Sequence, residues 1–299
     1  MAPPAGRPGA GYAMLTVLFD GIASGMLLFL ISVGLSVTLG LMGFVNLAHG
    51  AFAMLGGYVG VLLLGPGGLP FLAALPLVMV VVALAGVVLE RLLYRRLYGA
   101  THLDQVLFSI GLILMSIATA VYIFGDQQQP LTLPAFLRGQ IAPLGFDIGA
   151  YRLFLVVLGL LIAAALELLV QRTRFGARLR AAVDNPRAAR GMGIDVERVF
   201  TLTFALGSGL AGLGGALGVE VLGLDPGFPV KYIVYFLIVV AVGGSGSILG
   251  SLVAALILGI ADVSGKYYLP QVGAFVIYAV MVAMLIFRPQ GLFGRGRAR

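Results

Sequence analysis

Long stretches without a charged residue constrain this chain more than any other feature. After Asp20, no Asp, Glu, Lys or Arg occurs until Glu90, and the stretch from Tyr232 to Ala261 is also free of them. A helix needs about 20 apolar residues to cross a hydrocarbon core of about 30 Å. Each charge at the helix centre costs about 2.5–3.5 kcal/mol. These runs therefore predict helices that cross a membrane several times.

The composition supports the same fold class. Of the 299 residues, 60% are hydrophobic and 10% are charged, whereas soluble domains carry about 25% charged residues. Strands of a membrane β-barrel are about 10 residues long and alternate in polarity, but these runs are longer and apolar throughout. We expect an all-α, polytopic bundle of about 8–9 transmembrane helices, some of them interrupted, in one transmembrane domain over residues 1–299.

Charged and turn-forming residues divide the chain into spans. We expect these at Ala13–Leu41, Ala48–Leu64, Phe71–Leu89, Gln105–Phe124, Leu153–Val170, Val199–Val219, Tyr232–Val242, Ile248–Val263 and Tyr268–Phe287. Residues 125–150 are rich in Pro and Gln and predict a loop. If all nine segments cross, the N-terminus faces outward. The N-terminal arm lacks the pattern of a cleaved signal peptide.

Basic residues predict the orientation. The net charge is +7, and short cytoplasmic loops of membrane proteins are enriched in Lys and Arg. Residues 171–198 and 288–299 are the richest in Arg, and residues 91–96 carry three more. All three segments are expected on the cytoplasmic side, so the positive charge reflects membrane topology and does not indicate nucleic-acid binding.

Two interruptions of the apolar pattern are candidates to line a transport path. The first places Asn46, His49 and Gly50 within apolar sequence, and the second is GGSGS at 243–247, with Gly243, Gly244 and Ser245. Transporters often build their sites from broken helices near the middle of the membrane. The alternatives are a helix cap and an interfacial histidine in the first case, and a tight turn between two helices in the second.

Small residues predict close helix packing in the second half of the chain. The segment 206–218 contains six glycines. Gly214 and Gly218 form a small-xxx-small pair, which lets helix backbones approach closely.

The Arg-rich segment 171–198 contains a compact helix signal. Asn185 is a good N-cap, Pro186 suits the first helical position, and Gly193 can close the helix. A helix this short is unstable alone, so it must pack on something. Docking to a partner protein and binding to lipid headgroups are both open. The docking candidates are Asn185, Pro186, Arg187, Arg190, Gly191 and Gly193.

Catalytic chemistry has no support in the sequence. It contains no phosphate-binding GxxxxGK[ST] motif, no HExxH and no GxSxG, and it has two His and no Cys. We expect no catalytic, cofactor or metal site, so any ATPase that drives transport is a separate polypeptide. The acids within or beside the spans lie near predicted helix ends; they are Asp20, Glu90, Glu167, Glu220, Asp225 and Asp262. Asp262 is the first to test for a role in proton transport.

Three stretches together resemble the permeases of branched-chain amino-acid ATP-binding cassette importers. They are LGLMGFVNLAHGAFAMLGGYV at 39–59, RTRFGARLRAAVDNPRAARGMGIDVERVFTLTFALGSGLAGLGGAL at 172–217, and GGSGSILGSLVAALILG at 243–259 with FRPQGLFG at 287–294. The resemblance covers nearly the whole chain. It departs from the family pattern at Ala51, where relatives often have an acidic residue, and this bears on the substrate. Relatives are thought to carry branched-chain amino acids, urea, short amides or other small polar solutes.

The resemblance implies a multi-pass subunit in the cytoplasmic membrane of a bacterium or archaeon. It implies a second, related permease that helps to enclose the path. Two cytoplasmic ATPases would bind the short loop helices, here residues 186–193, and an extracytoplasmic binding protein would deliver the substrate. Membrane lipid would surround the bundle. The alternative function is a self-sufficient secondary transporter or channel for small solutes.

Overall fold

The protein is a bundle of α-helices. The computed structural model describes residues 10–44, 46–65, 67–141 and 148–293. Its α-helices are α1 (Ala10–Met42), α2 (His49–Leu64), α3 (Phe71–Leu92), α4 (His102–Phe124), α5 (Ala150–Arg172), α6 (Arg174–Asp184), α7 (Pro186–Gly191), α8 (Val196–Leu222), α9 (Phe228–Gly243), α10 (Ile248–Tyr268) and α11 (Gly273–Phe287). Short 3-10 turns, η1 (Tyr94–Leu97) and η2 (Ala135–Leu137), and an antiparallel pair, β1 (Gln140–Ile141) and β2 (Ile148–Gly149), complete the described elements.

The helices confirm the predicted polytopic membrane fold. Six of them, α1, α3, α4, α5, α8 and α10, are long and apolar enough to cross a membrane. The other apolar helices, α2, α9 and α11, are shorter, with 15 or 16 residues. Each predicted span corresponds to one of these nine helices, although the ends differ by several residues.

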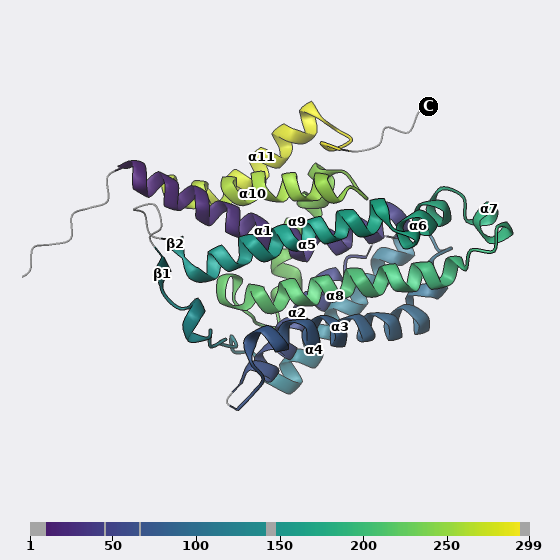
Figure 1. The fold of residues 1–299 in the computed structure, drawn as a ribbon, viewed down its shortest axis with the longest axis horizontal. Helices are drawn as coiled ribbons and strands as arrows, with labels where there is room; N and C mark the ends of the chain where they lie inside the picture. Colours follow the sequence, from purple (N-terminus) through teal and green to yellow (C-terminus); the bar gives the residue numbers. More distant parts are fainter. Residues whose placement is uncertain (1–9, 45, 66, 142–147, 294–299) are drawn as a thin grey trace, which may run out of the picture.

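The two ends of the bundle differ in charge. Helices α6 and α7 lie at one end, and the β1–β2 pair lies at the opposite end (Figure 1). Exposed arginines gather at the α6–α7 end; they are Arg91, Arg95, Arg96, Arg172, Arg174, Arg178, Arg187, Arg190 and Arg198. Because basic residues are enriched on the inner side of membranes, we infer that this end faces the cytoplasm and that the β1–β2 end faces outward.

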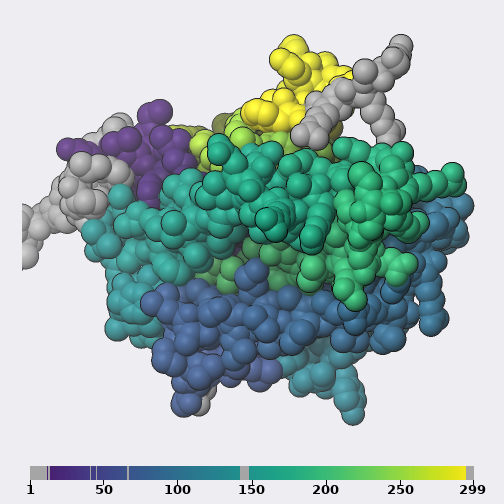
Figure 2. Space-filling model, turned by 45° about the vertical axis from the view of Figure 1, so that its right-hand side comes forward, coloured from purple at the N-terminus to yellow at the C-terminus, as the bar shows by residue number. Residues whose placement is uncertain are grey.

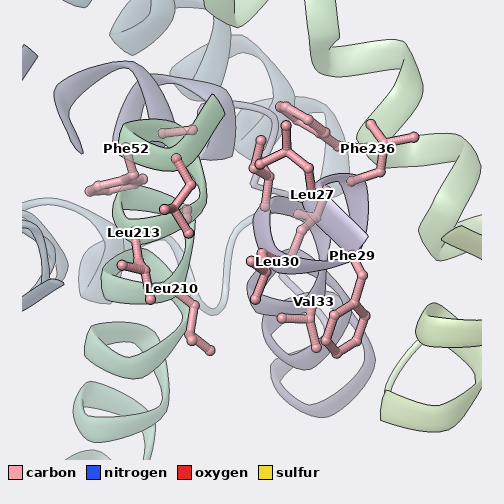
Figure 3. Packing of buried hydrophobic residues seen from close by; sticks show 14 of the residues in the cluster. Leu27, Phe29, Leu30, Val33, Phe52, Leu210, Leu213 and Phe236 are labelled. Carbon is pink, nitrogen blue, oxygen red and sulfur yellow. The ribbon is translucent and has the colours of Figure 1, made fainter. Parts of the chain in front are cut away.

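Helix α1 lies at the centre of the packing. It packs against α10, α8, α5 and α9. Figure 3 shows the side chains of Leu27, Leu30 and Val33 spreading from α1 toward several neighbours, with Leu210 of α8 on one side and Phe236 of α9 on the other. Because α1 is enclosed on all sides along its middle, it shows no polar face in the sequence.

Glycines set the distances between the central helices. A Cβ added at Gly207 of α8 would lie 3.1 Å from the carbonyl oxygen of Gly34 on α1. A Cβ added at Gly215 would overlap the carbonyl oxygen of Ala53 on α2. The backbones of α1, α2 and α8 therefore approach one another directly, as small residues allow in membrane helices.

One helix departs from the sequence-based expectation. Residues 171–198 were expected to form a loop with a single short helix, but the structure also contains α6 over Arg174–Asp184. Phe175, Leu179 and Ala182 recur at helical spacing and pack against the first turn of α8. Arginines lie at the intervening positions, so a search for charge-free runs does not reveal this helical spacing.

Candidate functional site

Helix α7 is a short, capped helix at the cytoplasmic end. The side chain of Asn185 accepts a hydrogen bond from the backbone N–H of Ala188 at 3.0 Å, and Pro186 occupies the first turn. At the other end Gly193 has a φ of 78° and donates its N–H to the carbonyl of Arg190. A side chain at Gly193 would be strained in this conformation. Both ends of the helix are therefore fixed as the sequence suggests.

A small apolar cluster supports α7. Ala189 is buried on α7 and packs with Leu179 and Ala182 of α6 and with Val196 and Val199 of α8. This cluster is separate from the main core of the membrane bundle. Because α7 would not be stable alone, this contact supplies the packing it needs and joins it to the first turn of α8.

The outer face of α7 is basic and open. Arg187 and Arg190 are exposed, and the following Met192 is 69% exposed. Gly191 is also exposed, with open space where a Cβ would project. A rigid helix that presents two guanidinium groups beside an apolar side chain can bind an acidic, partly apolar surface of another protein.

The first interruption lies at the start of α2 and is fully packed. Asn46 and His49 are both buried. The Oδ1 atom of Asn46 accepts a hydrogen bond from the Tyr94 hydroxyl at 2.9 Å, and Nε2 of His49 lies 2.7 Å from the carbonyl oxygen of Ile31. A Cβ added at Gly50 would come 3.0 Å from Pro229 at the start of α9. These residues join α2 to its neighbours, and their role in lining a path stays a prediction.

The second interruption is a tight turn between α9 and α10. Gly244 has a φ of 90° and Gly246 a φ of 83°, which favour glycine. The N–H of Gly246 donates to the carbonyl of Ser36 on α1 at 3.0 Å. Gly243 packs closely on Gly250, whereas Ser245 is exposed. The turn therefore lies beside the cytoplasmic half of α1, and Ser245 is its accessible residue.

The two glycines proposed for packing have different surroundings. A Cβ at Gly214 would lie 2.6 Å from Cγ1 of Ile31 on α1, which leaves no room for a side chain. A Cβ at Gly218 would meet its nearest atom, Cδ1 of Leu222, at 3.4 Å, an ordinary contact. The tight approaches of Gly207 and Gly215 were not singled out from the sequence, because the spacing of glycines does not reveal which face meets a partner.

A groove on the membrane face is unsuited to a polar solute. It has a volume of about 570 Å³ and runs between α3 and α5, with Leu206, Leu210 and Leu213 of α8 as its floor. Figure 2 shows the hollow between the blue surface of α3 and the teal surface of α5. All of its lining residues are apolar. Burying an unpaired charge there would be costly, so this groove faces lipid or another apolar surface.

A second recess, on the outer side, is charged. It has a volume of about 480 Å³ and is lined by Arg138, Arg152 and Glu220, together with Tyr151 and neighbouring residues. Arg152 also forms an ion pair with Asp20 of α1. The recess lies between residues 133–139 and the outer ends of α5 and α8, where a water-soluble partner could reach it.

The most enclosed acid among the described residues is one that the sequence analysis placed near a helix end without giving it a role of its own. Glu90, near the cytoplasmic end of α3, is 1% exposed. Both of its carboxylate oxygens accept hydrogen bonds, one from Tyr98 and one from Thr201, each at 2.8 Å. Its position near the end of α3 suggested that the Glu90 carboxylate reaches water, but η1 and α8 cover the side chain. Asp262 is also buried and is paired with Lys266 at 2.6 Å.

Known proteins with similar sequences are transport permeases. Residues 17–285 match the family model described as branched-chain amino acid transport system / permease component. The chain is 28% identical to the high-affinity branched-chain amino acid transport system permease protein BraD of Pseudomonas aeruginosa, covering 95% of this chain and 97% of the relative. It is 28% identical to LivH of Escherichia coli, covering 94% and 96%. No solved structure matches.

An archaeal relative shows how widely the likeness extends. The probable branched-chain amino acid transport permease protein LivH of Methanocaldococcus jannaschii is 30% identical over 292 residues, which cover 93% of this chain and 92% of the relative. The family match over residues 17–285 includes the interrupted start of α2, the α6–α7 segment and the turn before α10. With its apolar helices, the chain is a multi-pass protein of the cytoplasmic membrane and a transport subunit. It belongs to the family of branched-chain amino acid transport system permease components.

Proposed function

We propose that this chain is the membrane-spanning permease subunit of an ATP-binding cassette importer for branched-chain amino acids or a related small polar solute. The observation that carries the proposal is the family match over residues 17–285 of a chain that has no nucleotide-binding motif of its own. Relatives that align along nearly the whole chain are named for branched-chain amino acid transport. The energy for transport then comes from separate ATPase subunits, two of them in the complete importer.

Helix α7 is the proposed contact with one ATPase. Its N-cap Asn185, first-turn Pro186 and closing Gly193 hold the helix rigid, while Arg187 and Arg190 point away from the bundle's own surface. The apolar cluster beneath it connects the helix to α8. A displacement of α7 therefore also moves α8, which spans the membrane.

The transport path is proposed to form with a second, homologous permease. Among the described residues, the groove between α3 and α5 is apolar, and the start of α2 is closed by packing. A path for an amino acid, which carries both a positive and a negative charge, therefore requires the surface of a second subunit or another conformation of this one. Asn46, His49, Gly50 and the 243–247 turn are the segments proposed to face it when the importer opens.

The charged outer recess is the proposed contact for an extracytoplasmic binding protein. Arg138, Arg152 and Glu220 lie at its surface, and interfaces that form and dissociate repeatedly are polar. Selection of the substrate would then reside mainly in the binding protein, because few polar groups project from the membrane helices.

Charge reversal on α7 tests the ATPase contact. The double variant Arg187→Glu with Arg190→Glu should lower the amount of ATPase that co-purifies with this chain at least about tenfold, since several charge-assisted contacts are reversed. Membrane insertion should be unchanged. Arg138→Glu, at the other end of the molecule, is the matched control and should leave the ATPase bound. If the double variant retains a normal yield of ATPase, the arginines bind lipid headgroups or solvent and the docking assignment is wrong.

A further inference from the structure

Glu90 lies in an unusual position for a carboxylate. It is 1% exposed, on the last turns of α3, at the cytoplasmic end of the bundle. A buried ionisable group in a membrane protein is expensive and is often linked to function. Its cost is reduced only when both oxygens are hydrogen-bonded, so its partners indicate what it does.

Each oxygen of Glu90 is held by a different part of the chain. Oε1 accepts a hydrogen bond from the hydroxyl of Tyr98, which follows η1. Oε2 accepts one from the hydroxyl of Thr201 on α8, and both distances are 2.8 Å. Burial, and then the bond to Glu90, raise the pKa of the Tyr98 phenol, which therefore stays protonated and donates at physiological pH. On the surface beside them, Arg95 of η1 forms an ion pair with Glu197 of α8. The carboxylate thus bridges η1 and α8 through the end of α3.

The bond from Thr201 has an alternative acceptor. The same hydroxyl oxygen lies 3.0 Å from the carbonyl oxygen of Glu197, one turn earlier on α8. A threonine hydroxyl has a single hydrogen, so it serves either Glu90 or the backbone of its own helix as its main acceptor. A small movement of α8 away from α3 would leave the hydroxyl satisfied on its own helix. The bridge can therefore open without leaving a buried donor unpaired on the threonine.

The α8 side of the bridge leads to α7. Thr201 lies about one and a half turns from the start of α8, and Val196 and Val199 of those turns pack on Ala189 of α7. A displacement of α7 therefore moves the part of α8 that carries Thr201.

The η1 side of the bridge leads to the start of α2. Tyr94 is fully buried and donates its hydroxyl to Asn46 at 2.9 Å. Its ring lies among those of Phe44, Phe108 and Phe204, at centroid distances of 5.3, 5.1 and 4.7 Å. Because these contacts are tight, a shift of η1 reaches Asn46 and the first turn of α2.

We propose that Glu90 is a positioning residue that transmits movement of α7 and α8, through its bonds to Thr201 and Tyr98, to the interrupted start of α2. This inference rests on the proposed importer function, in which α7 contacts an ATPase. The Thr201 bond is the element with two arrangements that such coupling requires. In the structure described here the bridge is closed and the start of α2 is sealed.

The test uses the complete importer in proteoliposomes, with measurements of both ATP hydrolysis and uptake of radiolabelled leucine. Thr201→Val keeps the shape of the side chain but removes the hydroxyl, and Tyr98→Phe removes the other donor. Each should reduce leucine carried per ATP hydrolysed by about tenfold, within the range of typical coupling energies. Thr201→Ser restores a hydroxyl and should restore coupling. Thr119→Val is the matched control, because its hydroxyl on the exposed part of α4 bonds only within its own helix.

The outcomes separate this inference from the proposed function. If the unaltered importer hydrolyses ATP and transports leucine, but Thr201→Val and Tyr98→Phe keep the normal ratio of transport to hydrolysis, the inference is wrong. It is also wrong if Thr201→Ser loses as much coupling as Thr201→Val, since packing would then be the cause. Should Thr201→Val fail to assemble, Tyr98→Phe decides. Failure of the unaltered chain to bind ATPases or to transport would instead contradict the proposed function.

Discussion

The enclosed helices α1 and α8 are mostly buried within the protein, whereas the peripheral helices α4 and α5 are mostly exposed, and hydrophobicity alone does not show this difference. In their apolar windows, 83% of the α1 residues and 89% of the α8 residues are buried within the protein, against 17% for α4 and 22% for α5. Yet α8 has the lowest mean hydropathy of the six long helices, and α5 has the highest. The most buried helix is therefore the least hydrophobic.

This difference follows from the solvent. Lipid tails are as apolar as leucine, so moving a leucine from lipid into the protein gains little. What stabilises the centre of the bundle is close approach of backbones, which the glycines of α8 allow at α1, α2 and α3. The peripheral helices need apolar side chains to face lipid, and their sequences are rich in Leu, Val and Ile.

The largest expected difference in stability between the two regions comes from adding one methyl group to each. Gly215→Ala on α8 should destabilise the protein by about 3 kcal/mol or more, because the new Cβ overlaps the backbone of α2 and the helices must separate. Gly111→Ala on α4 has open space and should be neutral or slightly stabilising, by up to about 1 kcal/mol. Unfolding in mild detergent, followed by circular dichroism, measures both. Equal effects would show that packing distance does not distinguish the two regions.

A smaller effect should come from removing side-chain volume. Leu30→Ala on α1 leaves a cavity among fully buried neighbours and should cost on the order of 2 kcal/mol, since lost contacts rather than lost hydrophobic transfer set the penalty. Leu114→Ala on α4, where the leucine is 61% exposed, lets lipid fill the space and should cost little. The same unfolding measurement applies, and a larger loss at Leu114 would contradict a peripheral position for α4.

The smallest effect concerns hydrogen bonds between helices. The hydroxyl of Tyr151 on α5 is buried and donates to the carbonyl oxygen of Leu217 on α8 at 2.5 Å. Tyr151→Phe should cost about 1 kcal/mol, whereas Tyr122→Phe on the exposed face of α4 should have no measurable effect. An unchanged unfolding midpoint for Tyr151→Phe would mean that this hydrogen bond does not help to hold α5 to the centre.

The sequence supported most of the fold for a clear physical reason. Charged residues cannot remain in a bilayer without a partner, so the charge-free runs marked the membrane-spanning part of the chain, and Gly- and Pro-rich turns divided the longest runs into separate helices. The caps of α7 were also predictable, because Asn185, Pro186 and Gly193 act locally. These features depend on residues close together in the chain.

Features that depend on contacts between distant segments were not predictable in the same way. The bridge from Glu90 to Thr201 joins residues 111 positions apart, and nothing in the neighbourhood of Glu90 indicates its partner. Helix α6 was missed because its arginines look like a solvated loop. The closest glycine contacts depend on which faces of α1, α2 and α8 meet, and periodicity does not specify this in helices that are apolar all round.

The most direct measurement of the central claim is leucine uptake into proteoliposomes. Vesicles that contain this chain with a second permease, the ATPases and a binding protein should accumulate labelled leucine only when ATP is supplied on the cytoplasmic side. Vesicles that contain this chain alone should take up none, with or without an ion gradient. Uptake by the chain alone, driven by an ion gradient, would show a self-sufficient transporter and contradict the account.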